Sequence, residues 1–125
     1  MKHSFFFLFL VLSLSSLAQD KQNISVVTNA EPVFPAGDRA LYILVMNDLK
    51  YPEESKKKFV EGEVTLSFDV NPDSTVTNII LISGVGHGVD EEVKKIIKPL
   101  KFSPGKQNGM TVKMNTMYSF PVKAH

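Results

Sequence analysis

The chain has 125 residues, and its charges nearly cancel, with 14 lysines and arginines against 13 aspartates and glutamates. This balance lacks the basic excess with which proteins bind nucleic acid or anionic membranes, so we expect neither partner. The sequence contains no cysteine, which excludes a disulfide framework, a thiol nucleophile and lipid attachment through cysteine.

The first residues are typical of a secretory signal peptide. Lys2 supplies a positive charge, an apolar run follows over residues 5–12, and the small residues Ser16 and Ala18 lie two apart, as signal peptidase requires. A membrane-spanning helix would need roughly 20 apolar residues. We therefore predict a signal peptide over residues 1–18 that is cleaved after Ala18. An uncleaved segment would instead anchor the protein in the inner membrane.

The remaining chain is long enough for one small domain with a single core. Residues 19–31 are polar, follow no sustained hydrophobic period and stop at Pro32. We predict a short tether over residues 19–31, followed by one domain over residues 32–123.

Two helices are predicted at the start of this domain. Gly37 or Asp38 can cap the first helix. Its apolar residues recur at helical spacing, namely Leu41, Leu44, Val45 and Leu49. Tyr51 precedes a proline and is biased away from the helical conformation, so we expect the chain to break there. Pro52 suits the first position of a short second helix that runs to Lys58.

Two strands joined by a tight turn come next. Residues 63–70 alternate between apolar and polar side chains, which predicts a half-buried antiparallel strand. Residues 71–74, with the sequence NPDS, form the turn into a strand over residues 75–83. The centre of that strand, residues 79–82, has apolar groups on both faces, so one of these faces needs an explanation beyond the predicted core.

A third helix and a last strand complete the domain. The helix has an apolar stripe that we expect to lie on the sheet, made of Val89, Val93, Ile96, Ile97 and Leu100. Pro104 and Gly105 are predicted to end it, and residues 108–109 allow a positive φ before one long strand over residues 110–122. One face of that strand has Val112, Met114, Thr116, Tyr118 and Phe120, and the other has Lys113, Asn115, Met117 and Ser119.

No motif predicts catalysis. The glycine loop over residues 83–88 lacks the spacing of phosphate-binding loops, and the acidic residues 90–92 would repel a phosphate. His87 has no cysteine or histidine at metal-ligand spacing. The carboxylates at residues 53–54 and 90–92 open helices, where negative charge is stabilising without any catalytic role. We expect no enzymatic activity, no cofactor and no small-molecule substrate.

An ordered set of short motifs resembles the C-terminal domain of TonB, the periplasmic energy transducer of Gram-negative bacteria. The resemblance covers residues 32–122. Its motifs are FPAG at 34–37, ALY at 40–42, NDLKYP at 47–52, EGEV at 61–64, NPD at 71–73, Val76, NI at 78–79, DEE at 90–92 and FSPGKQNG at 102–109. It implies an α+β fold, a three-stranded antiparallel sheet with two main helices packed on one face and the last strand at an edge. Ser74 stands where the family usually has glycine, so either the turn type differs or this residue is strained by about 1 kcal/mol.

The resemblance also implies a periplasmic protein-binding module associated with TonB-dependent transport across the outer membrane. An edge strand leaves N–H and C=O groups unpaired, and such modules resemble β-augmentation domains that take up an extended receptor segment. The partner-binding residues carried over from the family are Leu49, Lys50, Met110, Val112, Lys113, Asn115, Met117 and Ser119. The alternative is a structural domain that uses the sheet edge and the face of Ile80 and Ile82 for homodimerisation or for contact with the cell wall.

Overall fold

The structure is a computed structural model that describes residues 28–124, so the predicted signal peptide and most of the predicted tether lie outside the described residues. Within this range no helix is both long and apolar enough to cross a membrane. The elements in chain order are α2 (Asp38–Asp48), α3 (Glu53–Lys57), β1 (Glu61–Val70), β2 (Val76–Ser83), α4 (Val89–Ile97), β3 (Gly105–Gln107), β4 (Met110–Val112) and β5 (Met114–Lys123).

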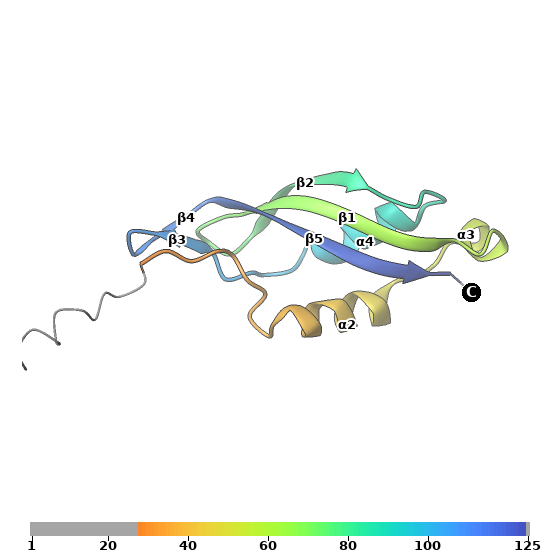
Figure 1. The fold of residues 1–125 in the computed structure, drawn as a ribbon, viewed down its shortest axis with the longest axis horizontal. Coiled ribbons are helices and arrows are strands. Elements are labelled where there is room, and N and C mark those ends of the chain that lie inside the picture. Colours follow the sequence, from red (N-terminus) through yellow and green to blue (C-terminus); the bar gives the residue numbers. More distant parts are fainter. Residues whose placement is uncertain (1–27, 125) are drawn as a thin grey trace, which may run out of the picture.

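The main sheet has three antiparallel strands in the order β2-β1-β5, with β1 in the centre (Figure 1). Strand β5 pairs with β1 in one unbroken register that runs from Glu61↔Lys123 to Val70↔Met114. The β1–β2 pairing instead contains two register shifts. The predicted α+β fold, with the last strand at an edge of the sheet, is confirmed.

Helices α2 and α4 cover one face of this sheet, because each turns an apolar stripe towards it (Figure 1). The buried apolar side chains of the two helices are Leu41, Val45, Val89, Val93 and Ile97, and those of β1 and β5 are Val64, Leu66, Phe68, Val70, Tyr118, Phe120 and Val122. Aromatic rings fill the centre of this core, with ring centroids 5.2 Å apart for Phe68 and Phe102 and 5.9 Å apart for Phe68 and Tyr118. The alternation predicted from the sequence is therefore the one that builds the core.

Two predicted boundaries are wrong. Helix α4 ends at Ile97 rather than near Pro104, because Pro99 has no N–H with which to continue the helical hydrogen bonds. The predicted long last strand is divided at Lys113, where the chain changes partners. The segment before it, β4, forms a hairpin with β3, and the segment after it, β5, joins the main sheet.

The first described residues run beside the β3–β4 hairpin. Ala30 and Lys106 exchange two backbone hydrogen bonds of 3.0 and 2.8 Å, and the Gly109 N–H donates to the Thr28 carbonyl at 2.9 Å. Val33 and Ser103 form a second bridge of the same kind. Part of the predicted tether is thus bound to the fold through its backbone.

The turn between β1 and β2 has a non-glycine residue in the left-handed region. Ser74 has a φ of 75°, and its N–H donates to the Asn71 carbonyl at 2.9 Å. Of the two alternatives that the sequence left open, the structure has the strained residue. This strain is typically about 1–3 kcal/mol when the surrounding turn holds the residue in place.

Candidate functional site at the edge of strand β5

Within residues 28–124, strand β5 has β1 as its neighbour on one side and no strand on the other. Along an antiparallel strand, the N–H and C=O groups of successive residues point alternately to one side and to the other. The Ala124 N–H donates to the Val60 carbonyl at 2.8 Å, on the side of β1. The Lys123 N–H donates to the Tyr51 hydroxyl at 2.9 Å, on the opposite side. The odd-numbered residues of β5 therefore direct their backbone groups away from β1.

This alternation defines the open edge, which we take as residues 115–119 of β5. Asn115, Met117 and Ser119 direct both N–H and C=O groups outward, and no other backbone group within residues 28–124 bonds to them there. Pro121 has no N–H to offer. The next outward N–H after that of Ser119 is that of Lys123, and it already donates to the Tyr51 hydroxyl. We therefore take the open edge to end before Pro121.

The side chains of the open edge lie on the outer face of the sheet, and two of the three form hydrogen bonds with side chains of β1. The Asn115 amide donates to Ser67 Oγ at 2.9 Å and to Asp69 Oδ1 at 3.0 Å. Ser119 Oγ lies 2.8 Å from Thr65 Oγ1. These bonds fasten β5 to the central strand and leave its backbone donors unused.

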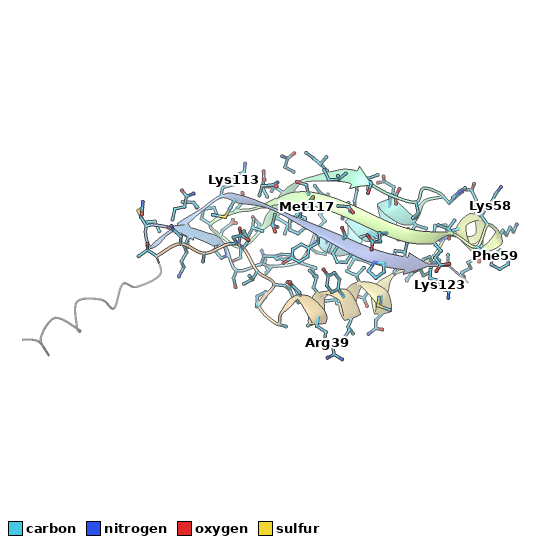
Figure 2. All side chains as sticks on the ribbon, in the orientation of Figure 1. Arg39, Lys58, Phe59, Lys113, Met117 and Lys123 are labelled. Atoms are coloured by element: carbon cyan, nitrogen blue, oxygen red, sulfur yellow. The ribbon has the colours of Figure 1, made fainter. Side chains whose placement is uncertain are left out.

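Met117 is the apolar residue of this face. Its side chain is 60 % exposed, and Figure 2 shows it between Lys113, which precedes β5, and Lys123 at the end of the strand. It lies opposite Ser67, which lies opposite Ile80 on β2. The outer face of the sheet therefore has a short apolar row, to which the exposed Ile82 also belongs.

The carboxylate of Asp69, on β1 beside the start of the open edge, is held in place by hydrogen bonds. The hydrogen bond from Asn115 is the largest influence and lowers the pKa of Asp69 below its ordinary value of 3.8. Burial opposes it by raising the pKa, and smaller effects of Asn78 and Lys113 lower the pKa again. Lys113 Nζ lies 3.7 Å from Asp69 Oδ2. Asp69 is thus ionised at neutral pH and ties both neighbouring strands to β1.

The inner side of β5 is fixed by helix α2. The Tyr118 hydroxyl donates to Asp38 Oδ1 at 3.1 Å. Burial, together with the negative charge of Asp38, raises the pKa of Tyr118 to about 12. The Tyr42 and Phe120 rings meet edge to face with centroids 5.5 Å apart. These contacts hold β5 in place from the inner face of the sheet.

The structure brings only some of the sequence-predicted site residues together. Asn115, Met117 and Ser119 lie side by side on the open edge, and Lys113 precedes them. Met110 and Val112 belong to β4 in the separate hairpin. Leu49 is in the core, with 9 % of its surface exposed, whereas the neighbouring Lys50 is exposed.

Sequence reasoning did not identify the residues that limit the edge. A proline within a predicted strand signals a missing donor, so Pro121 could have been found. The role of Tyr51 could not, because 72 residues separate it from Lys123.

A pocket of about 510 Å³ lies at this end of β5, lined by Met46, Tyr51, Glu61, Gly62, Glu63, Pro121, Val122 and Lys123. In the described part of the chain, no three side chains come together as potential metal ligands.

Comparison with known proteins supports a family assignment. The family model of the Gram-negative bacterial TonB protein C-terminal matches residues 47–122. Protein TonB of Escherichia coli (strain K12) is 32 % identical over 84 residues, which are 66 % of this chain and 34 % of that protein. The chain therefore spans about a third of the length of this relative.

Two solved structures have the same fold. The solution structure of the Helicobacter pylori TonB C-terminal domain has a TM-score of 0.53 and 19 % identity, and the match covers 67 % of this chain and 89 % of that one. The Pseudomonas aeruginosa domain has a TM-score of 0.50 and 20 % identity, over 80 % and 90 % of the two chains. Since the family model covers more than half of the sequence, this chain belongs to the family of Gram-negative bacterial TonB C-terminal domains.

Proposed function

We propose that this protein is a periplasmic, non-enzymatic binding module of TonB-dependent transport. Its open edge, residues 115–119 of β5, takes up an extended segment of an outer-membrane receptor by β-augmentation. The observation that carries the proposal is the set of outward N–H and C=O groups at Asn115, Met117 and Ser119. An added strand would satisfy them with main-chain hydrogen bonds.

The rigidity of β5 supports this proposal. The strand pairs with β1 over ten residues without a bulge, and α2 fastens it from below through Tyr118 and Asp38. A partner would therefore dock on a strand that is already ordered, and little of the binding free energy would be lost in ordering the domain.

The outer face favours a second candidate, self-association. Ile80, Ile82 and Met117 are each about half exposed or more and lie near one another across the sheet. Sedimentation of the domain separates the two candidates. A monomer favours the receptor function, whereas a tight dimer that must dissociate before a peptide binds favours self-association.

The test of the receptor function is the variant Met117→Pro. This change removes one outward N–H and leaves the bonds to β1 in place, whereas Asn115→Pro would also remove the amide that binds Asp69. The control, Met117→Ala, removes the same side chain but keeps the N–H. The probes are synthetic peptides that tile the periplasm-exposed segments of the outer-membrane receptors from the same genome.

We expect at least one peptide to shift the NMR amide signals of residues 115–119. Met117→Pro should weaken its binding about tenfold, as the loss of one hydrogen bond and a steric clash imply. Met117→Ala should remain within a few-fold of the parent protein. Equal affinities of the parent protein and Met117→Pro would contradict β-augmentation at this edge.

A further inference from the structure

The pocket beyond the open edge, which we call the end pocket, lies where backbone pairing stops. Pro121 offers no N–H, and Tyr51 already accepts the N–H of Lys123. A segment that pairs with residues 115–119 therefore finds no free N–H on β5 between Ser119 and Lys123. The next contact of such a segment is therefore made by a side chain, and the end pocket is the cavity that adjoins it.

The walls of the end pocket suit a long aliphatic stem. Met46 projects from α2 with 61 % of its surface exposed, and Tyr51 and Pro121 add an aromatic and an aliphatic wall. The volume of about 510 Å³ is ample for a single extended side chain.

The rim of the end pocket is acidic. Glu61 and Glu63 both line it and are exposed, and neither forms an ion pair with any residue in the range 28–124. Lys123 lies opposite Glu61 in the register but does not approach it within ion-pair distance. Two carboxylates therefore face one ammonium group, which leaves a net negative rim.

The pocket at the other edge of the sheet has the opposite charge. It lies between β2 and α4, has a volume of about 490 Å³ and is lined in part by Glu91, Lys94, Lys95 and Lys98. Two of these lysines are already paired with glutamates. The acidic rim is thus particular to the edge that can accept a strand.

We propose that the end pocket accepts a lysine or arginine side chain of the segment that pairs with β5, an inference that rests on the proposed function. The aliphatic stem lies along Met46 and Pro121, as the stems of long cationic side chains do on apolar surfaces. The cationic head reaches Glu61 and Glu63, and the Tyr51 ring offers a cation–π face. The pocket thereby selects among strands that the backbone alone cannot distinguish.

The test uses seven-residue peptides of alternating valine and threonine. One terminal residue is lysine, norleucine or glutamate, and each is placed at either the N-terminal or the C-terminal end. Norleucine keeps the stem of lysine without its charge. Binding is followed by the NMR amide signals of residues 115–119 in the parent protein, in the double variant Glu61→Gln/Glu63→Gln, and in Glu91→Gln, which changes the same chemistry in the other pocket.

We expect the parent protein to prefer lysine over norleucine about three- to tenfold, which is the range for two partly exposed ion pairs. The preferred end reports the direction of the bound strand. The double variant should lose this preference and keep its affinity for norleucine, whereas Glu91→Gln should change neither. Lys123→Ala should strengthen lysine binding, because it removes the one cation of the rim.

Two failures are distinguishable. If peptides shift residues 115–119 without any preference for lysine, or if the preference survives the double variant, the assignment of the end pocket is overturned while the proposed function stands. If no peptide shifts these signals and Met117→Pro behaves like the parent protein with every probe, the proposed function fails and the end pocket assignment with it.

Discussion

The two edges of the main sheet differ in regularity. Strand β5 keeps one register with β1 over its full length. Strand β2 shifts register twice, and Asn78 adopts a φ of 55° at the shift between Thr77 and Ile80. Bulges twist an edge and interrupt its row of donors and acceptors. The edge of β2 is therefore poorly suited to pairing with a further strand, whereas the edge of β5 is regular.

The edges also differ in how the core holds them. Tyr118, Phe120 and Val122 of β5 are buried, whereas Val76 is the buried residue of β2, and Ile79 and Leu81 are only partly covered. Since side-chain packing fastens β5 from within, its outer backbone groups are not needed for stability. The better-packed strand, β5, is thus the one whose outer N–H and C=O groups can stay unpaired without loss of stability.

The largest expected effect tests this difference in anchoring. Phe120→Ala removes a fully buried ring and should lower the free energy of unfolding by about 3–5 kcal/mol. Leu81→Ala on β2 should lower it by only about 1–2 kcal/mol, because the side chain is partly exposed. Urea unfolding followed by circular dichroism measures both. Equal losses would mean that the two edges are equally anchored.

A smaller effect tests the alternation along β5. Thr116→Pro removes a donor that points to β1 and should destabilise the fold by about 1–3 kcal/mol. Met117→Pro removes an outward donor and should cost less than about 1 kcal/mol, as Pro121 is already tolerated at an equivalent position. Thermal unfolding of the two proline variants shows which of them loses more stability. The reverse order would show that the outward residues have been assigned to the wrong side.

The smallest effect concerns Asp69, which links the two edges through Asn115 and Asn78. Its folded pKa is lowered, chiefly by the hydrogen bond from Asn115. The carboxylate therefore contributes stability above the ordinary pKa of 3.8, and that contribution is lost as the pH falls through the lowered folded pKa. The parent protein should therefore have a higher free energy of unfolding than Asp69→Asn at pH 6, and this stability gap should become small below about pH 4. Denaturant unfolding across this range measures the gap. A gap independent of pH would exclude this contribution.

Much of the fold was predictable from periodicity. Residues 63–70 alternate cleanly because one face of β1 meets the core and the other meets water. The break at Lys113 was not predictable in the same way. The alternation of apolar and polar residues runs from Met110 to Asn115 with no break at Lys113. Only the choice of partner changes there, which is a tertiary property.

The site was predictable in part for the same reason. Asn115, Met117 and Ser119 share a face in any register, and the outward backbone groups belong to these residues. The limits of the site depend on contacts between distant segments, such as Tyr51 with Lys123. Leu49 adjoins an exposed residue in sequence and is nevertheless buried, because it directly follows α2 and packs into the core.

The short length of the open edge bears on solubility. Stacking of strands into fibrils favours uninterrupted segments of six or seven residues with high β-propensity and no proline. The open edge from Asn115 to Ser119 is shorter than this and stops before Pro121. Beyond it, the Tyr51 hydroxyl blocks the growing ladder. The open edge is thus a poor template on which further copies of the chain could accumulate.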